Sequence, residues 1–386
     1  MRYTNILVLG GGIGGVVSAN LLRKKLGEEH RIVLVDRKTR HEFCPSYPYL
    51  MMGWREPDHV TKDLSLLKKK NIDYVNGKVL KIDPADRSVE TSSGDHTYDY
   101  LIIALGAELT PDIIPGLSDA AYHVYELEDA LRLREALKAF SGGTVAIGIS
   151  KPPFRCPAAP FETALLMDYY FRLKGIREKV DLQFFNPGPL PLGVAGPKIG
   201  KMVVQMLESR DISFHPSFLL SSVDSKKGEI TSEKGEKMKF DLLFAIPPHQ
   251  TPKVVREAGL TDETGWIPVD KKTLKTEYDD VYALGDVTKI MLAMGKPLPK
   301  AGVFAHYQAE VVAQNIAVEI QGTGEEREFK GDGTCLMEVG FGKAIMVRGN
   351  FYAEPTPNVK VQWPKVSRLW HWSKVMWEKL WFWRWF

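Results

Sequence analysis

Cysteine is scarce in this sequence of 386 residues, and its three cysteines are too few for a disulfide scaffold. Long apolar runs are absent as well, because no run reaches the roughly eighteen residues of a membrane-spanning helix. The formal net charge of +3 is too small to indicate a nucleic-acid-binding protein. Residues 1–20 show no cleavable apolar leader, so we expect no secretion. What remains is a globular chain of ordinary composition, long enough for two or three domains.

A glycine-rich loop follows the first predicted strand, residues 5–9, and precedes a predicted helix. Gly10 would make the tight turn, Gly12 would admit a pyrophosphate, and Gly15 would let the helix pack on the strand. Asp36 ends the second predicted strand, 21 residues after Gly15, which is the spacing of a carboxylate that binds a ribose hydroxyl. Together the strand, loop, helix and acid predict a dinucleotide-binding domain.

A second glycine-rich loop is missing where a pyridine-nucleotide enzyme would have one. Residues 144–150 are predicted as a buried strand and turn, but bulky and proline-rich residues follow in place of glycines. Cys156 lies in this replacement, beside Arg155 and shortly before a helix predicted to begin near Pro160. Because a cation and a helix N-terminus both lower a thiol pKa, we expect Cys156 to be activated. One glycine loop and one cysteine loop favour a flavoprotein that takes electrons from a sulfur compound.

Two further segments favour flavin over nicotinamide. Residues 98–106 and 280–286 are each predicted as a strand that ends in a small-residue turn, and they resemble the two fingerprints of FAD enzymes with two dinucleotide-binding domains. A helix is predicted after Pro299, and its N-terminal amides would direct positive charge toward the flavin. The FAD-binding residues predicted in these segments are Ala104, Gly106, Gly285, Asp286, Lys300 and Gly302. FAD is the predicted cofactor, and no metal site is predicted.

With these motifs the chain resembles the sulfide:quinone oxidoreductases and the flavoproteins of flavocytochrome c sulfide dehydrogenases, and more distantly the type II NADH:quinone oxidoreductases. Cys156, followed by Pro-Ala-Ala-Pro, matches the first redox cysteine of that family, and Cys335 matches the second. A third cysteine of many members has no counterpart in residues 121–130. Cys44 lies elsewhere and is interpreted as a packing residue, whereas Pro45 is expected to pack against the flavin ring.

The resemblance implies a sulfur chemistry at the two matching cysteines. The oxidised enzyme holds a disulfide or sulfur-bridged pair, and hydrosulfide attacks it, so that Cys156 keeps the persulfide and Cys335 leaves as a thiolate. Two electrons then pass from Cys335 into FAD, and reduced FAD reduces quinone. Glu162 and His306 are candidate proton carriers, although a helix-start carboxylate and a core histidine are the alternative interpretations.

The composition changes sharply at the C-terminus, where seven of the nine tryptophans lie between residues 363 and 386. A helix capped by Ser367 would have one polar stripe, formed by Ser367, His371, Lys374 and Glu378, and an apolar face with Leu369, Trp372, Met376, Leu380 and Trp383. Its basic residues outnumber the single acid; they are Lys365, Arg368, Lys374, Lys379 and Arg384. Such a helix is typical of a membrane interface, and burial against the core or a partner subunit is the alternative. We expect a peripheral, monotopic protein at the cytoplasmic face of the cell membrane.

A quinone would be drawn from the lipid beside this tail. In the family a lysine of this region approaches the flavin and the quinone, and Lys374 is the best match. Phe341 and Phe351 follow Cys335 closely in the sequence. They are candidates for stacking on the quinone ring, with core packing as the alternative.

The predicted fold class is α/β, with two Rossmann-like dinucleotide-binding domains and a C-terminal amphipathic membrane-binding module. Residues 1–110 and 241–325 would form the FAD domain, residues 111–240 a second Rossmann-like domain without a nucleotide motif, and residues 326–386 the redox and membrane module. The chain is predicted to be a sulfide:quinone oxidoreductase that uses hydrosulfide and membrane quinone and binds no nucleic acid. A type II NADH:quinone oxidoreductase and a flavoprotein subunit with a cytochrome partner stay as alternatives, and a homo-oligomer is left open.

Overall fold

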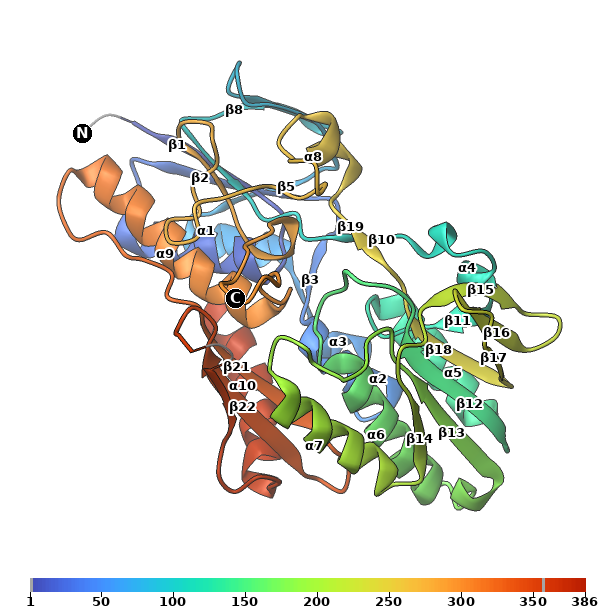
Figure 1. The fold of residues 1–386 in the computed structure, drawn as a ribbon. Coiled ribbons are helices and arrows are strands. Elements are labelled where there is room, and N and C mark those ends of the chain that lie inside the picture. The colour runs from blue at the N-terminus through green and yellow to red at the C-terminus, as the bar shows by residue number, and fades with distance from the viewer. Residues whose placement is uncertain (1–2, 356–357) are drawn as a thin grey trace.

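The computed structural model describes residues 3–355 and 358–386, and two five-stranded parallel sheets form its two main domains (Figure 1). The first sheet has the order β20-β9-β1-β2-β5, with β1 (Asn5–Leu9), β2 (Arg31–Asp36), β5 (Asp73–Asn76), β9 (Tyr100–Ile103) and β20 (Val281–Ala283). Its inner strands are buried on both faces, which is why they are continuous apolar runs. Because β20 joins from a distant stretch of chain, this domain is discontinuous.

The second sheet has the order β11-β18-β12-β13-β14 and repeats the same parallel plan. Its strands are β11 (Ala121–Tyr122), β12 (Gly143–Ile149), β13 (Val180–Phe185), β14 (Ile212–His215) and β18 (Leu242–Ile246). The predicted fold class of two Rossmann-like sheets is confirmed. The predicted boundary at residue 241 is wrong, however, since β18 lies between β11 and β12 in the second sheet. β18 belongs to the second sheet because its backbone pairs with β12, although it follows the predicted boundary in the sequence.

Helices cover both sheets. On the first sheet α1 (Ile13–Lys25) packs closely against α9 (Gly302–Gln321). The second sheet is covered by α5 (Leu127–Ala139), α6 (Ala159–Leu173) and α7 (Pro197–Glu208). Two antiparallel three-stranded sheets complete the domains: β6 (Val79–Asp83), β7 (Ser88–Thr91) and β8 (Gly94–Thr97), and β15 (Leu220–Asp224), β16 (Glu229–Ser232) and β17 (Lys237–Lys239). The smaller elements are β3 (Arg40–Glu42), β4 (Thr61–Asp63), β10 (Glu108–Leu109), β19 (His249–Gln250), α2 (Tyr47–Met51), α3 (Pro57–Val60), α4 (Leu117–Ala120) and α8 (Lys253–Glu257).

The C-terminal region is a β-sheet with a helix across it (Figure 1). It comprises β21 (Asp332–Glu338), β22 (Ala344–Asn350), β23 (Asn358–Val361) and α10 (Arg368–Trp385). Ser367 caps α10, because its side-chain oxygen accepts a hydrogen bond from the Leu369 amide at 3.0 Å. Among residues 3–355 and 358–386, no helix has the length and apolar character needed to cross a bilayer.

Three aromatic side chains of α10 are built into the core of the first domain. Trp381, Phe382 and Trp385 pack in the same cluster as side chains of β1, α1 and α9. Burying one large side chain stabilises a fold by about 1.5–3 kcal/mol, so α10 is part of the domain and not an appendage. The expectation that both dinucleotide-type domains end before α10 is therefore wrong.

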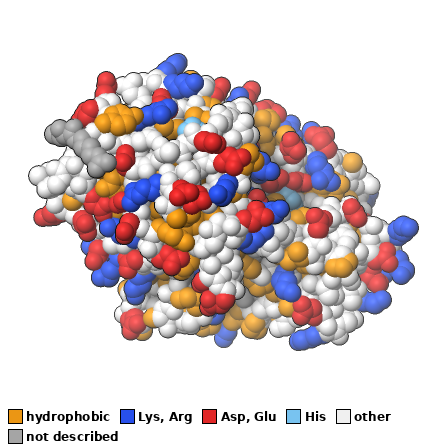
Figure 2. All heavy atoms as spheres, turned by 90° about the horizontal axis from the view of Figure 1, so that it is seen from above, with side chains coloured by type: hydrophobic (Ala, Val, Ile, Leu, Met, Phe, Trp, Pro, Cys, Tyr) orange, Lys and Arg blue, Asp and Glu red, His pale blue; other side chains and the backbone are white. Residues whose placement is uncertain are grey.

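The surface seen in Figure 2 carries acidic and basic side chains interspersed, as the small net charge implies. Large exposed apolar side chains gather instead on α10 and on the segment before it. They are Trp363, Val366, Leu369, Trp372, Met376, Leu380 and Trp383. Trp372 is 64% exposed and Trp383 82% exposed, so most of the surface of each indole is open to solvent.

Candidate active site between the two sheets

The glycine loop after β1 has the geometry of a phosphate cradle. Gly10 has a φ of +106°, which favours glycine, and a side chain at Gly15 would collide with the Gly10 carbonyl oxygen. At Gly12, by contrast, no atom lies within 4 Å of the place a Cβ would occupy. The loop is tight where the chain turns and open where a ligand would approach.

Three cofactor-type segments converge on the start of α1. A Cβ at Gly14 would lie 3.6 Å from the Ala104 side chain and 3.7 Å from the Ala305 side chain, and it would collide with Leu284. Gly302 lies directly against Ile13, so the N-terminus of α9 sits beside the glycine loop. Ala104 follows β9 and Leu284 follows β20 in the parallel sheet, and Gly302 begins the helix that packs on α1. The sheet and this helix pair therefore bring the segments together.

Asp36 lies at the end of β2 and faces the glycine loop. Its carboxylate accepts hydrogen bonds from the Gly11 amide and, at 2.7 Å, from the Lys38 amide. Burial raises the pKa of Asp36, while these two amide donors oppose the rise. The carboxylate is thus fixed in place at the loop.

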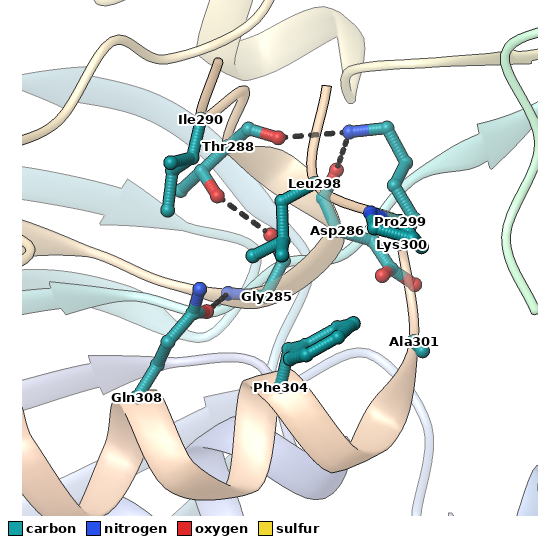
Figure 3. A pocket seen from close by; sticks show the side chains of 10 residues that line it. All are labelled: Gly285, Asp286, Thr288, Ile290, Leu298, Pro299, Lys300, Ala301, Phe304 and Gln308. Carbon is teal, nitrogen blue, oxygen red and sulfur yellow. Dashed lines mark hydrogen bonds between the residues drawn. The ribbon is translucent and has the colours of Figure 1, made fainter. Parts of the chain in front are cut away.

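A second pocket wall is formed by the turn after β20 and the start of α9 (Figure 3). Lys300 Nζ donates to the carbonyl oxygens of Asp286 at 2.7 Å and Thr288 at 2.8 Å, and it lies 3.3 Å from the centre of the Trp266 ring. Burial lowers the pKa of Lys300 to about 8. The Asp286 oxygen Oδ1 is buried and has no hydrogen-bond partner among the described residues. A ligand hydroxyl or amide is the group that such an oxygen lacks.

These features fit FAD. Gly12 and Gly106 leave open space at the loop, Asp286 offers a free acceptor, and α9 presents the amides of its N-terminus. Pro45 lies in a short 3-10 turn that begins at Cys44, on the segment between the two sheets. The residues that would hold the cofactor are Gly10, Gly12, Gly15, Asp36, Pro45, Ala104, Gly106, Gly285, Asp286, Lys300 and Gly302.

Cys156 lies on a strained loop that is tied to the FAD-type domain. Its φ is +52°, a left-handed conformation that costs free energy in a residue with a Cβ. The Cys156 amide donates to the Lys300 carbonyl at 2.6 Å, and the Cys156 carbonyl accepts from the Ala159 amide at 3.0 Å where α6 begins. The loop is therefore held between the cofactor-type pocket wall and α6.

Cys335 reaches the same place from the C-terminal sheet. It lies in the middle of β21 opposite Val347, and it packs with Cys156 against one core cluster. The charge of Cys335 contributes to the pKa of Cys156, and the charges of Glu162 and Lys374 act on both thiols. The structure thus brings together two cysteines that are 179 positions apart in the sequence.

The predicted activation of Cys156 by Arg155 is wrong for the free dithiol. Burial raises the pKa of Cys156 to about 12, with Cys335 and Glu162 adding to the rise, and burial raises the pKa of Cys335 to about 11. The Arg155 guanidinium instead lies 5.3 Å from the centre of the Tyr125 ring and donates to the Tyr125 carbonyl. Both thiols are therefore neutral at physiological pH in the reduced chain.

A buried ion pair stands beside the two thiols. Lys374 of α10 donates to Glu162 Oε1 of α6, and the same oxygen accepts the Glu338 amide at 3.1 Å. Burial would lower the pKa of Lys374, but the Glu162 and Glu338 carboxylates raise it above its ordinary value, so Lys374 is charged. Burial raises the pKa of Glu162 against the opposing effect of Lys374. Lys374 is thus not a solvated head group at a membrane surface, although it counts among the basic residues that predict a membrane-interface helix.

The two phenylalanine candidates lie at opposite ends of the β21–β22 hairpin. Phe341 is in the turn, 44% exposed, and contacts the Tyr169 ring at 4.4 Å and the Arg210 guanidinium at 4.8 Å. Phe351 is at the open end and packs edge-to-face on Phe304, 5.2 Å away. The seven-residue length of each strand separates them, so they do not flank one ring together.

The polar and apolar faces of α10 are inverted relative to an ordinary surface helix. The predicted polar stripe points inward: Lys374 and Glu378 are buried, and Glu378 accepts from Ser46 at 2.6 Å and from Arg55 at 2.9 Å. The predicted apolar face, with Trp372, is the exposed one. Sequence periodicity found both faces, and the buried ionic partners explain why the polar one turns inward.

Two other candidates have ordinary surroundings. Cys44 packs against the same core cluster as the other two cysteines; its Sγ is 3.7 Å from the Glu42 carbonyl and burial raises its pKa. His306 pairs with Glu310 on α9 at 3.3 Å. Sequence reasoning missed Glu338 and Tyr49 and placed His371 only in the polar stripe of the helix; the three side chains meet behind the Glu162–Lys374 pair. The only sequence signal for Glu338 is an acid in a strand next to Met337 and Val339, which are both buried.

Comparison with known proteins gives this architecture its family. The model of the pyridine nucleotide-disulphide oxidoreductases matches residues 4–149 and 173–309. The chain belongs to that family. The prediction of an FAD-dependent oxidoreductase is thereby confirmed. The two matched segments leave out the Cys156 loop, all of α6 except its last residue, the second part of α9 and the whole C-terminal region.

Named relatives match over nearly the whole chain. The mitochondrial sulfide:quinone oxidoreductase of Mus musculus is 26% identical over 92% of this chain and 80% of its own length. The sulfide-quinone reductase of Aquifex aeolicus is 28% identical over 98% of this chain and 90% of its own length. The X-ray structure of the Aquifex aeolicus sulfide:quinone oxidoreductase superposes with a TM-score of 0.89 at 26% identity, covering 99% of this chain and 91% of that one.

Proposed function

We propose that this chain is a sulfide:quinone oxidoreductase in which Cys156 and Cys335 form the sulfur site. The observation that carries the proposal is the convergence of these two cysteines where a pyridine-nucleotide loop would otherwise be. Relatives named for sulfide and quinone match 92–98% of the chain. The FAD domain is proposed to comprise residues 3–110 together with the stretch from about 251 to 325, after β19.

The two cysteines support a thiol–disulfide exchange with hydrosulfide. Hydrosulfide attacks the sulfur of Cys156 in a Cys156–Cys335 disulfide, the S–S bond breaks, and Cys335 leaves as a thiolate while Cys156 carries the new persulfide. The Lys374 ammonium, which lowers the pKa of both thiols, stabilises the leaving thiolate. FAD, when bound, supplies the two-electron acceptor for sulfur and the two-electron donor for quinone.

Quinone and its membrane complete the proposal. The exposed apolar face of α10 and the exposed Phe341 would lie in a bilayer interface, with Lys365, Arg368, Lys379 and Arg384 at the headgroups. Lys374, buried on the other face of the same helix, would be the residue nearest the quinone head. Peripheral binding at the cytoplasmic face suits a chain with only three cysteines, too few for a structural disulfide scaffold.

The experiment is anaerobic mixing of the yellow purified protein with sulfide and, separately, with NADH. We expect sulfide to bleach the flavin absorbance within the time of one catalytic turnover, and we expect NADH to leave this absorbance unchanged. Type II NADH:quinone oxidoreductases of Staphylococcus aureus are 24% identical over 85% of this chain. Bleaching by NADH and not by sulfide would replace the proposal by that activity. Transfer to a soluble cytochrome but not to quinone would favour a dehydrogenase subunit instead.

A further inference from the structure

A second titratable cluster lies behind the ion pair and has no part in the sulfur step. Glu338 of β21 accepts hydrogen bonds from the Tyr49 hydroxyl at 2.7 Å and from His371 Nδ1 at 2.9 Å, both on Oε1. Its other oxygen, Oε2, is buried without a partner among the described residues. Glu338 itself is 1% exposed, so this carboxylate is held away from water.

The buried carboxylates of this group have different ion-pair partners. Lys374 pairs with Glu162, and both Glu162 and Glu338 raise its pKa. Around them, Arg55 is paired with Glu378 at 2.9 Å, and Lys379 reaches the same carboxylate at 3.5 Å. Tyr49 bonds to Glu338 and stays neutral, since burial raises its pKa beyond any physiological range. Among the described residues the ion-pair partner of Glu338 is His371, so the buried carboxylate and the partly exposed imidazole form one hydrogen-bonded unit.

His371 is the group of this cluster that meets solvent. Its side chain is 18% exposed, whereas those of Glu338 and Lys374 are 1% and 5% exposed. It lies one turn before Lys374 on the inner side of α10, between the exposed apolar face and the buried pair. A proton can therefore enter at His371 and pass to Glu338 along an existing hydrogen bond.

We propose that His371 and Glu338 deliver protons from the surface of α10 to the buried Lys374–Glu162 pair during quinone reduction. The inference rests on the proposed function. Hydrosulfide brings two electrons and one proton, whereas a quinol carries two electrons and two protons. One further proton per turnover comes from water, and it travels from His371 to Glu338 and then to the pair that adjoins the thiols.

The test separates proton supply from electron transfer. Holoenzyme is reduced with dithionite, so the outcome does not depend on sulfide, and is then reoxidised by a short-tailed quinone or by ferricyanide, which takes electrons without protons. Glu338→Gln and His371→Asn should slow reoxidation by quinone at least about tenfold and change the ferricyanide rate less than about twofold. The quinone step should show a larger solvent deuterium effect in both variants, and imidazole should restore His371→Asn. The matched control is His215→Asn, a half-buried histidine bonded to Gln183 in the second domain.

A second readout does not use turnover. Infrared difference spectra between oxidised and reduced protein should contain a protonated-carboxyl band that disappears in Glu338→Gln. Equal slowing with quinone and ferricyanide would mean that the variants only disturb packing, and it would overturn the proposal. An unchanged quinone rate in both variants would do the same. Loss of sulfide bleaching in otherwise unaltered wild type would instead contradict the proposed function alone.

Discussion

The loop after β1 and the loop after β12 stand at the same position of two similar parallel sheets but are built for opposite chemistry. The first is three glycines with open space at Gly12, and the second is a proline-rich turn with a thiol at a φ of +52°. The first opens toward a large anionic ligand, and the second closes that space and holds one reactive atom. Two copies of one architecture have thus become a cofactor site and a sulfur site, and the Cys156–Lys300 backbone bond joins them.

The largest effect is expected at the glycine loop. Gly12→Val would place a side chain in the space that the pyrophosphate needs, where a Cβ has no atom of the chain within 4 Å. The protein should fold but purify with less than about a tenth of its flavin, as measured by absorbance per chain. Gly188→Val is the control, since a Cβ there lies 3.7 Å from its nearest neighbour and away from the cofactor pocket. Full flavin content in Gly12→Val would remove the contrast between the loops.

The cysteine loop gives the next largest effect. Cys156→Ala and Cys335→Ala should each slow flavin bleaching by sulfide by about a hundredfold or more, because the two sulfurs act as one unit. Cys44→Ala, whose thiol contacts the Glu42 carbonyl, is the matched control and should change the rate less than about threefold. Stopped-flow absorbance under anaerobic conditions measures all three. If Cys44→Ala abolishes bleaching while Cys156→Ala does not, the sulfur site is misplaced.

The sequence allowed both loops to be predicted because each is a local pattern. Strand, turn residues and following helix are consecutive, so the spacing of Gly10, Gly15 and Asp36 has physical meaning without the fold. The position of β18 and the charge cluster of Glu162, Glu338 and Lys374 depend on contacts between distant segments, which periodicity does not encode. The prediction that Arg155 activates Cys156 was wrong for the same reason. Arg155 is adjacent in the sequence, but its guanidinium packs on the Tyr125 ring.

The two faces of α10 extend the comparison from loops to a helix that serves both domains. Deleting residues 366–386 would remove Trp381, Phe382 and Trp385 from the core, so deletion is expected to destabilise the fold. Replacing Trp372, Leu380 and Trp383 by Gln changes only exposed side chains. The triple variant should keep its flavin and its bleaching by sulfide but lose most binding to lipid vesicles in a sedimentation assay. Its turnover should fall several-fold more with a long-tailed quinone than with a water-soluble one.

Unchanged vesicle binding of the triple variant would show that the exposed face of α10 does not meet lipid. The control is Lys234→Gln, which changes an exposed side chain in the turn between β16 and β17 of the second domain. It should leave both vesicle binding and the ratio of the two quinone rates unchanged.

The smallest expected effect concerns the protonation of the cysteine loop. The pKa of Cys156 is raised to about 12 and that of Cys335 to about 11, so both thiols stay neutral until the pH approaches those values, and thiolate appears as the pH rises. Alkylation of the reduced Cys44→Ala protein by iodoacetamide should therefore accelerate by about tenfold per pH unit between pH 7 and 10. Lys374 lowers both pKa values, whereas Glu162 raises them. Removing both charges with Lys374→Met and Glu162→Gln avoids an unpaired buried charge and should therefore shift this profile only slightly. An alkylation rate that levels off near pH 8 would show that the cysteine loop does lower the pKa of its thiol. The two loops would then differ in geometry but not in the way that they favour a negative charge.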